Sequence, residues 1–380
     1  MPDELPPEPL PNGGFLPRLQ SGKIKITYAC PFRCRMCDYW RNPPRNELTL
    51  EEWKNVIDEL LELGCGKIHI SGGEPTARKD WLAIVSHAAE AGLRVAMTTN
   101  GAGFRSGDLE ALYRVRFRSL SVSLDAASSA LHDRIRGVKG SFKKAVDLME
   151  KIRKRNMKKK HRIKMRINMV VQAANYRDAV AIHHLAHRVG AEDVVLMPVD
   201  EKGIYSNGTP KGKVTRGKKG PRLHLNEREL ADYNKKIRPA VRLVREQLGF
   251  PAAPAHYDIF GSDTSRAAAG EYARGYYEKH LCFIPWIHVF VGARGDVYLC
   301  CMTHNNIEPL GNVRAEPLKR IFTGETYTRL RDRFLHERLG VCHRCDQYLV
   351  RNAALEKALR EGSRSAGGQE GKRRNRPSTG

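Results

Sequence analysis

The stretch Tyr28–Trp40 reads Y-A-C-P-F-R-C-R-M-C-D-Y-W and carries three cysteines in a C-x3-C-x2-C arrangement. Cys30, Cys34 and Cys37 lie directly after the alternating run 23–28, which predicts a strand. Three thiolates on one loop can hold three irons of a four-iron cubane, which normally takes four cysteines, and they leave the fourth iron open. The alternative is a zinc knuckle or three unrelated thiols, and the spacing alone fits this alternative and the cluster-binding loop about equally well.

Short predicted strands alternate with predicted helices through the first half of the chain. The pattern predicts strands at residues 23–28, 67–71, 94–99, 119–124, 162–171 and 193–198. It predicts helices at residues 49–63, 81–91, 109–115, 142–156 and 178–189, the first beginning with a capping box at Thr49 and Glu52. Such alternation indicates a parallel sheet with right-handed crossovers, and six units are fewer than the eight of a closed barrel. We therefore expect an α/β fold with a partial, TIM-like (β/α)6 barrel.

Polar residues and glycines follow the predicted strands, which is where parallel α/β folds build ligand sites. Gly72, Gly73 and Glu74 follow the second strand, Asn100 follows the third, and Asp125 follows the fourth. Because the carboxyl ends of parallel strands share one edge, these residues and the cysteine loop should converge there. The alternative explanations are a simple glycine turn, an Asn-Gly turn and a helix cap.

Two further cysteines flank a predicted β-hairpin in the last third of the chain. The alternating runs 287–291 and 297–299 are separated by G-A-R-G and predict the hairpin. Cys282 precedes the first run and Cys300 follows the second, so the hairpin should bring the two thiols close together.

Another pair of cysteines follows a predicted helix at residues 318–335. Cys342 and Cys345 form a C-x2-C unit, and with the hairpin pair they supply four thiols. On spacing alone, four thiols in two separated pairs favour structural zinc. Cys301 could replace its neighbour Cys300 as a ligand, whereas Cys65 is expected to be a small packed residue.

The 380-residue chain is strongly basic, with a formal net charge of +24. Residues 153–166, 202–222 and 360–380 together carry +20 of this charge. We interpret these segments as solvated surface, with attraction of an anionic substrate as the alternative. Few aromatic residues interleave with the basic ones, which argues against binding of single-stranded nucleic acid.

The expected location is the cytoplasm, without a membrane partner. The sequence shows no apolar run that could span a bilayer and no signal peptide, and grouped thiols favour metal binding in a reducing compartment. The predicted organisation is a disordered proline-rich arm (1–17), a (β/α)6 core (18–199), a linker with a basic loop and a helix (200–275), a small α+β domain of hairpin and helix (276–350) and a disordered basic tail (361–380).

In this setting the motifs resemble those of radical S-adenosylmethionine (radical SAM) enzymes over residues 23–198. The shared features are the cysteine loop, G-G-E-P at 72–75, T-N-G at 99–101 and S-V-S-L-D at 121–125, each at a predicted strand end. The position before the third cysteine is often aromatic in that family and is Met36 here. The later cysteines resemble the single-cluster form of the SPASM extension, called a twitch domain, through C-x12-G-x4-C at 282–300 and C-x2-C at 342–345.

The resemblance implies three cofactors: S-adenosylmethionine, a 4Fe–4S cluster that binds it, and one auxiliary 4Fe–4S cluster. The implied ligands are Cys30, Cys34 and Cys37 for the first cluster and Cys282, Cys300, Cys342 and Cys345 for the second. In the family, the open iron binds the amino and carboxylate groups of S-adenosylmethionine, and one-electron reduction releases a 5′-deoxyadenosyl radical that abstracts a substrate hydrogen. With all four auxiliary ligands in place no iron is open, which favours an electron-accepting role.

The same resemblance assigns contacts to S-adenosylmethionine. The implied contact residues are Met36, Gly72, Gly73, Glu74, Asn100, Ser123, Arg136 and Leu196. Glu74 would accept hydrogen bonds from the ammonium group, and Arg136 would pair with a carboxylate. Asn100 and Ser123 would contact the carboxylate or the ribose. The adenine site would be lined by Met36 and Leu196.

The implied function is a radical SAM oxidoreductase that acts on a small polar metabolite, such as a sugar, an aminocyclitol or a nucleoside-like compound. The basic loops would suit an anionic substrate, and the electron donor would be a flavodoxin or a ferredoxin. The alternative is maturation of a ribosomally synthesised peptide. A more distant alternative is a non-catalytic zinc protein that binds RNA, which would leave the G-G-E-P and S-V-S-L-D motifs unexplained.

Overall fold

The computed structural model describes residues 5–11, 13–37, 39–41, 44–200, 222–304, 306–346 and 348–373, with side chains as far as residue 361. Nearly all of the predicted basic loop (202–222) and the last seven residues of the predicted tail lie outside these ranges. None of the helices in the described part of the chain is long and apolar enough to span a membrane.

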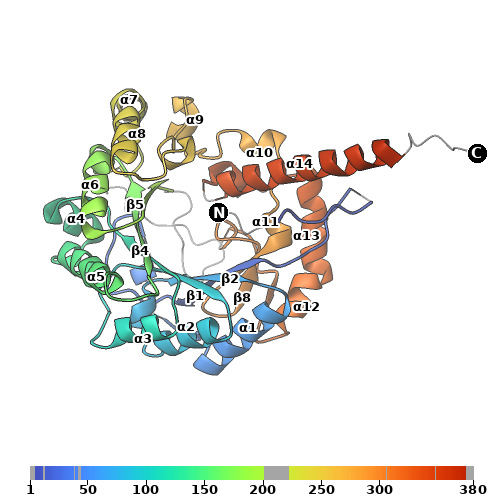
Figure 1. The fold of residues 1–380 in the computed structure, drawn as a ribbon, viewed down its shortest axis with the longest axis horizontal. Helices are drawn as coiled ribbons and strands as arrows, with labels where there is room; N and C mark the ends of the chain where they lie inside the picture. Colours follow the sequence, from blue (N-terminus) through green and yellow to red (C-terminus); the bar gives the residue numbers. More distant parts are fainter. Residues whose placement is uncertain are drawn as a thin grey trace, which may run out of the picture.

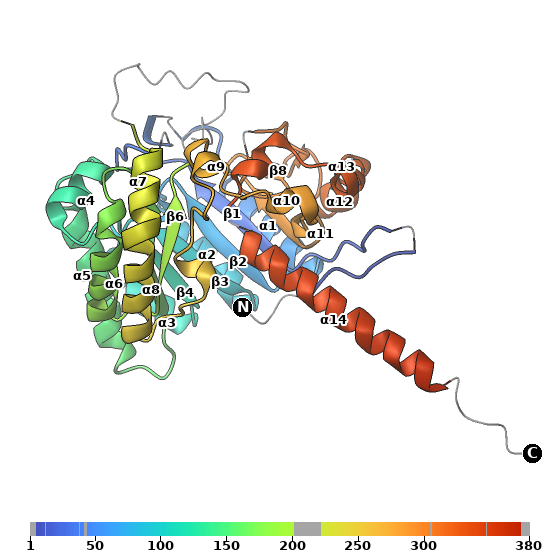
Figure 2. The ribbon, with the colours of Figure 1, turned by 90° about the horizontal axis from the view of Figure 1, so that it is seen from above.

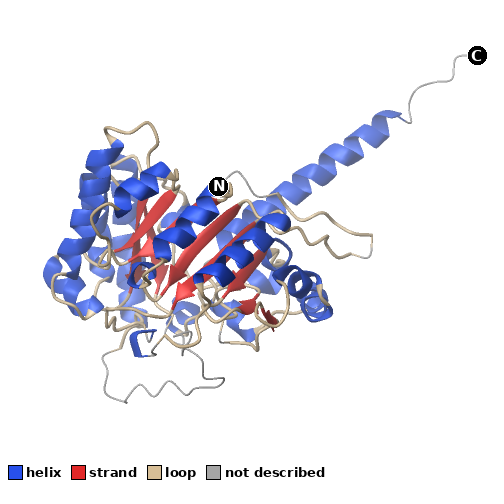
Figure 3. Cartoon of the chain, turned by 90° about the horizontal axis from the view of Figure 1, so that it is seen from below, coloured by secondary structure: helices blue, strands red, loops and turns tan. Residues whose placement is uncertain are grey.

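A nine-stranded sheet forms the centre of the molecule (Figures 1 and 3), with the order β6-β5-β4-β3-β2-β1-β7-β8-β9. The strands are β1 (Ser21–Thr27), β2 (Lys67–Gly72), β3 (Arg94–Thr99), β4 (Ser119–Ser123), β5 (Lys164–Val171), β6 (Asp193–Pro198), β7 (His288–Val291), β8 (Asp296–Tyr298) and β9 (Gly311–Asn312). β1–β6 pair in parallel, which confirms the six predicted βα units. The sheet is open, as expected for a partial barrel.

Helices cover one face of this sheet (Figure 3). The α-helices are α1 (Leu50–Glu62), α2 (Trp81–Glu90), α3 (Asp108–Arg114), α4 (Ser129–Arg136), α5 (Ser141–Asn156), α6 (Ala179–Val189), α7 (Glu227–Asp232), α8 (Arg238–Gln247), α9 (Thr264–Ala268), α10 (Tyr276–Lys279), α11 (Ile284–Ile287), α12 (Leu318–Thr323), α13 (Glu325–His336) and α14 (Leu349–Arg373). Short 3-10 turns lie at Tyr39–Arg41, Pro75–Ala77, Tyr176–Asp178, Pro254–His256 and Gly340–Arg344, and a π-helical turn lies at Tyr233–Ile237. The capping box at Thr49 is present as predicted, with Glu52 accepting from the Thr49 N–H at 2.7 Å.

The two faces of the parallel sheet differ in chemistry. Side chains on the helix-covered face are apolar and buried: Ile24, Ile26, Ile68, Ile70, Val95, Met97, Leu120, Val122, Ile167, Met169, Val194 and Leu196. Because side chains alternate along a strand, the other face carries the positions between them. These are largely polar and include Lys23, Lys25, His69, Ser71, Thr98, Ser121, Ser123, Arg166 and Asn168. The inner face is therefore suited to a polar ligand.

The predicted hairpin is present, but it extends the main sheet instead of standing apart. β7 pairs in parallel with β1, from Ser21 opposite His288 to Ile24 opposite Val291. β8 then pairs with β7 in the antiparallel sense. The C-terminal cysteines are consequently attached to the same sheet as the first cysteine loop, on the neighbouring strand.

Both ends of the chain differ from the disordered segments that we predicted. In the N-terminal arm, Phe15 makes edge contacts with Phe283 and Trp286 at centroid distances of 5.4 Å. At the other end, α14 continues from residue 349 to residue 373 and projects away from the body of the protein (Figure 2). The apolar ring at Phe15 explains the first difference, because burying it stabilises the arm against α11.

Candidate active site

The first cysteine loop follows β1 at the carboxyl edge of the sheet and is fixed by the turn that follows β2. The backbone N–H of Gly73 donates to the Thr27 carbonyl at 2.8 Å, and that of Glu74 donates to the Ala29 carbonyl at 2.8 Å. Within the loop, the Cys37 N–H donates to the Cys34 carbonyl at 3.3 Å. The predicted convergence of the cysteine loop and the G-G-E-P turn is confirmed.

Close backbone contact explains why two glycines follow β2. A Cβ on Gly72 would lie 2.2 Å from the Thr27 carbonyl oxygen, and Gly72 has a φ of +151°. A Cβ on Gly73 would lie 2.3 Å from the Ala29 carbonyl oxygen. Any side chain here would push away the segment that leads into Cys30, so the glycines position the cysteine loop.

The carboxylate of Glu74 accepts hydrogen bonds from three other residues of the protein. Its carboxylate accepts from the Asn100 N–H at 2.6 Å, the Thr99 hydroxyl at 2.8 Å, and both the hydroxyl and the N–H of Thr76 at 2.6 and 3.1 Å. Its side chain is buried, and burial raises its pKa although these donors oppose the shift. Glu74 thus ties the β2 turn to the β3 turn, and its contact with an ammonium group stays a prediction.

Helix α4, which the sequence did not predict, forms the second support of the cysteine loop. The Arg33 N–H donates to the Arg136 carbonyl at 3.2 Å, and the Arg35 N–H donates to the Ile135 carbonyl at 3.0 Å. Gly137 ends the helix with a φ of +70°, where a Cβ would lie 2.5 Å from the Arg33 carbonyl oxygen. In the sequence, the glycine at position 137 was the available signal for a helix end.

Arg136 is buried and faces Cys34 and Asp125. Its Nε pairs with Asp125 Oδ2 at 2.7 Å, and its Nη1 donates to Cys34 Sγ at 3.8 Å. The carboxylate that this guanidinium binds here is that of Asp125, and the contact of Arg136 with S-adenosylmethionine stays a prediction. The arrangement places a fixed positive charge beside a thiol that has to ionise to bind iron.

Asn100 also faces the loop. Its Nδ2 lies 3.9 Å from Cys30 Sγ, and its Oδ1 accepts from the Ala102 N–H at 2.9 Å. Burial raises the pKa of the Cys30 thiol to about 12 and also raises that of Cys34, where Arg136 opposes the shift. Buried thiols of this kind ionise when a metal binds them, and N–H donors beside the sulfurs stabilise the charged form. The donor set therefore fits a cluster.

The remaining predicted contacts lie in different environments. Ser123 ends β4 on the polar inner face, opposite Asn168, and Met36 is half-buried in the cysteine loop. Leu196, in contrast, is buried among the apolar side chains of the helix-covered face. Its neighbours Val195 and Met197 occupy the inner face. The adenine contact at Leu196 stays a prediction, and the side chain lies on the helix-covered face of the sheet.

The second cysteine set gathers around Cys282, Cys300, Cys342 and Cys345. These thiols are close enough to raise one another's pKa: Cys300 acts on Cys345, and Cys282 acts on Cys300, Cys342 and Cys345, in each case after burial itself. Cys301 Sγ instead lies 3.5 Å from the Tyr348 hydroxyl. Cys301 also raises the pKa of Cys300, after burial, so the choice of Cys300 over its neighbour as the ligand stays a prediction.

Aromatic and amide side chains enclose this second set, and sequence reasoning missed them. Asn352 Nδ2 lies 3.6 Å from Cys282 Sγ and 3.0 Å from the Tyr277 hydroxyl, while its Oδ1 accepts from the Phe283 N–H at 2.7 Å. The Tyr277 hydroxyl lies 3.9 Å from Cys345 Sγ. Asn352 belongs to α14, so the site extends past the boundary predicted at residue 350. The isolated Asn within an amphipathic run was the only signal for it.

Neither cysteine set resembles a mononuclear metal site. Within the described residues, no three His, Cys, Asp or Glu side chains are placed to hold a single ion. A cubane is bound by thiolates on different irons, so its ligands need not converge on one point. The spread of the thiols is compatible with two clusters.

Lys25 and Tyr28, at the end of β1, contact residues near both cysteine sets. Lys25 Nζ lies over the Tyr39 ring at 4.1 Å and over the Phe290 ring at 5.5 Å. Burial, with help from Lys23, lowers the pKa of Lys25 to about 7, and Cys301 and Cys37 oppose the shift. The Tyr28 hydroxyl contacts His304 Nε2 at 3.2 Å. Lys25 and Tyr28 therefore lie between residues of the first set and the hairpin that carries the second.

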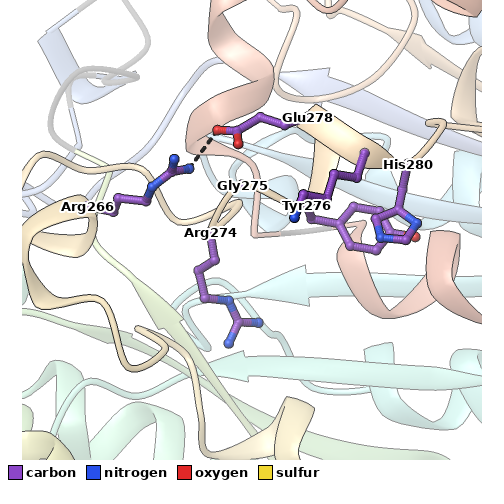
Figure 4. A pocket seen from close by; sticks show the side chains of 7 residues that line it. Arg266, Arg274, Gly275, Tyr276, Glu278 and His280 are labelled. Carbon is purple, nitrogen blue, oxygen red and sulfur yellow. Dashed lines mark hydrogen bonds and ion pairs between the residues drawn. The ribbon is translucent and has the colours of Figure 1, made fainter.

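A surface hollow of about 340 Å³ lies beside α10 (Figure 4). Its lining consists of Arg266, Arg274, Gly275, Tyr276, Glu278, Lys279 and His280. Arg266 points at Glu278 and pairs with it at 2.6 Å, and the Tyr276 and His280 rings stack at 4.4 Å. Arg274, on the same hollow, pairs with Asp258 at 3.3 Å.

Two family models match the chain. Residues 24–196 match the radical SAM superfamily, and residues 282–346 match SPASM, an iron–sulfur cluster-binding domain. The first match contains β1–β6 with the first cysteine loop. The second contains all four thiols of the later set.

Similar proteins agree with these matches. Over 330 residues the chain is 27% identical to an AdoMet-dependent heme synthase of Methanosarcina barkeri, which covers 84% of this chain and 86% of that protein. Over 130 residues it is 34% identical to a PqqA peptide cyclase of Bradyrhizobium diazoefficiens, which covers 33% of each.

Solved structures show the same fold at low identity. Streptococcus suis SuiB bound to its precursor peptide SuiA has a TM-score of 0.62 and 16% identity, covering 87% of this chain and 71% of that one. The enzyme anSMEcpe with bound AdoMet and a peptide has a TM-score of 0.59 and 16% identity, covering 87% of each chain.

Proposed function

Because the chain belongs to the radical SAM superfamily and carries a SPASM domain, we propose that it cleaves S-adenosylmethionine reductively and modifies a peptide substrate. Cys30, Cys34 and Cys37 would hold a four-iron cluster, which together with bound S-adenosylmethionine would supply the radical chemistry needed to take a hydrogen atom from an unactivated C–H bond. The four later cysteines would hold a SPASM-type cluster.

The observation that carries this proposal is the support of three thiols by two separate turns and a helix end. The β2 turn fixes the segment before Cys30, and α4 fixes Arg33 and Arg35 on either side of Cys34. Asn100 and Arg136 direct N–H groups at two of the three sulfurs. Hydrogen bonds and charge at the sulfurs are among the factors that set the reduction potential of such a cluster.

A peptide substrate is supported by the relatives more than the small sugar-like metabolite that the sequence suggested. The 34% identity to a PqqA peptide cyclase is the highest identity among the relatives described above, and it lies over a third of the chain. The polar inner face between the two cysteine sets offers hydrogen-bonding partners for a peptide backbone. Ser71 and Asn168 there have buried oxygen atoms without a partner in the described part of the protein.

A second candidate substrate is a small carboxylate-bearing metabolite. The match to an AdoMet-dependent heme synthase over 84% of the chain favours it. Lys23 and Arg166 lie on the inner face, and neither forms an ion pair with another described residue. Arg166 Nε donates to the Ser121 hydroxyl at 2.6 Å, which fixes one edge of the guanidinium and leaves the other for an anion.

The test uses anaerobically reconstituted protein with dithionite as reductant and 5′-deoxyadenosine as the readout. We expect deoxyadenosine together with about eight irons per chain, the content of two cubanes. Short peptides encoded near the gene are then added one at a time and analysed by mass spectrometry. A peptide that gains or loses mass supports the proposal. Stimulation by a carboxylate metabolite alone would favour the second candidate, and absence of deoxyadenosine would contradict both.

A further inference from the structure

Four exposed cationic side chains surround the outside of the first cysteine loop. We call Arg33, Arg35, Arg134 and Lys139 the cationic collar. Arg33 and Arg35 alternate with the buried Cys34, so their side chains leave the loop on the solvent side while the thiol points inward. Arg134 and Lys139 lie on α4 and on the connection that follows it, and both are exposed.

The backbone holds the two halves of the collar side by side. The two hydrogen bonds from Arg33 and Arg35 to the end of α4 join the segments, and Gly137 lets them approach within contact distance. A rigid framework of this kind presents its charges in a fixed pattern, which favours recognition of a protein surface over diffuse attraction of ions.

No carboxylate of a described residue pairs with the collar. Residues 29–37 contain no acid, and Asp133 is the only acid in residues 129–144. Asp133 accepts from the Gly140 N–H at 2.6 Å, and from the Ser141 hydroxyl and the Phe142 N–H at 2.8 Å each. These three hydrogen bonds hold the Asp133 carboxylate at the start of α5. Among the described residues none of the four cations forms an ion pair.

We propose that the cationic collar is the docking surface for an acidic one-electron carrier protein. The inference rests on the proposed function, because the electron needs a destination at Cys30, Cys34 and Cys37. Electron transfer slows steeply with distance, so the reductant has to dock on the surface nearest to those thiols, and the collar lies directly outside Cys34. One electron leaves the reduced carrier and enters the cluster site, and no atom is transferred.

A second basic region of the described chain, residues 153–166, lies too far from the cysteine loop to dock an electron carrier next to it. Residues 153–166 lie at the end of α5, whose 16 residues span about 24 Å from its start beside the collar. Because α5 returns from the carboxyl edge of the sheet to the opposite edge, this region is distant from the cysteine loop. Lys154 and Lys158 are exposed there, and they provide a matched control.

The test compares the double variant Arg134→Glu/Lys139→Glu with the control Lys154→Glu/Lys158→Glu. Each holoenzyme is titrated with an oxidised bacterial flavodoxin at several salt concentrations, and 5′-deoxyadenosine formation is driven either by reduced flavodoxin or by dithionite. In the collar variant we expect flavodoxin affinity and the flavodoxin-driven rate to fall about tenfold at low salt, with a weaker salt dependence. The dithionite-driven rate should be unchanged in both variants.

Several outcomes would overturn the assignment. These are unchanged flavodoxin affinity in the collar variant, an equal loss in the control, or an equal loss with dithionite. The single variant Lys139→Glu, in the connection after α4, gives the same comparison if the double variant does not fold. If no protein forms deoxyadenosine, the proposed function fails, and the flavodoxin titration still decides whether the collar binds the carrier.

Discussion

Cys30, Cys34 and Cys37 share one loop, whereas Cys282, Cys300, Cys342 and Cys345 come from three segments of the C-terminal region. The first set is held mainly by backbone hydrogen bonds to the β2 turn and to α4. In the second set, backbone bonds such as that from the Cys345 N–H to the Cys342 carbonyl (3.1 Å) lie within single segments, and side chains, chiefly Asn352 and Tyr277, join the segments to one another. Backbone support tolerates many substitutions, whereas a side-chain cage depends on each of its members. The second site should therefore be the more fragile of the two.

Replacing a thiol of the first loop should have the largest effect. In Cys37→Ala we expect loss of 5′-deoxyadenosine to background, because two thiols from one loop cannot hold the open-iron cluster. The measurement is deoxyadenosine after anaerobic reconstitution with dithionite. Cys65→Ala is the control, since Cys65 is buried outside both sets and donates to the Lys67 carbonyl at 3.2 Å. Deoxyadenosine from Cys37→Ala at the control level would contradict the assignment.

Replacing a thiol of the second set should abolish conversion of the substrate while S-adenosylmethionine is still cleaved. Cys345→Ala should retain about four irons and uncoupled deoxyadenosine formation, and should lose product. Cys301→Ala is the matched control, because Cys301 contacts Tyr348 and lies outside the group of four. We expect it to keep about eight irons. The reverse pattern in the two variants would mean that Cys301 is the ligand.

The side chains that enclose the second set, chiefly Asn352 and Tyr277, can be altered without removing a cysteine ligand. Asn352→Ala leaves the buried Phe283 N–H without its acceptor, which costs about 1–3 kcal/mol, and removes the donor beside Cys282. Urea unfolding and the rate of iron release to a chelator measure the two effects. Lys357→Ala, on the exposed side of the same helix, should change neither. Iron release from Asn352→Ala at the wild-type rate would show that the cage does not protect the cluster.

The smallest effect is expected at the contact between the two regions. Arg314 pairs with Glu52 at 2.6 Å, and Arg314 holds the pKa of Glu52 at about 2. Because the folded pKa lies below the usual value, the pair stabilises the protein above about pH 4.5, and this contribution is lost as the pH falls toward 2. Glu52→Gln should cost about 0.5–1 kcal/mol at pH 7, since solvent screens the pair.

Urea unfolding at pH 7 and pH 3.5 measures this contribution. The difference between wild type and Glu52→Gln should be smaller at pH 3.5. Glu51→Gln is the control, because Glu51 is exposed and contacts only Lys54 among the described residues. A pH-independent difference would show that the ion pair is not its source.

Local patterns predicted the parallel part of the fold well, because each βα unit is encoded by adjacent residues. The cysteine loop, the glycine turn and the capping box at Thr49 were all predicted and are all present. The partners of individual side chains were less predictable. The sequence does not reveal that Glu74 and Arg136 bind groups of the protein itself, or that Asn352 approaches Cys282, because these contacts join residues 11 to 70 positions apart.

The position of Leu196 shows a different limit. A strand alternates its faces with every residue, so neighbouring positions of β6 lie on opposite faces of the sheet, and Leu196 lies on the helix-covered one. The predicted range of β6 was correct, and Val195 and Met197 are the inner-face positions of this strand.

The central claim is that the chain holds two separate four-iron clusters, of which only the first binds S-adenosylmethionine. The most direct test is electron paramagnetic resonance of dithionite-reduced protein, with and without S-adenosylmethionine, for wild type and Cys345→Ala. We predict two overlapping cluster signals in the wild type, one of which changes when S-adenosylmethionine is added, and only that one in Cys345→Ala. A single signal in the wild type, or a signal in Cys345→Ala that does not respond to S-adenosylmethionine, would contradict the claim.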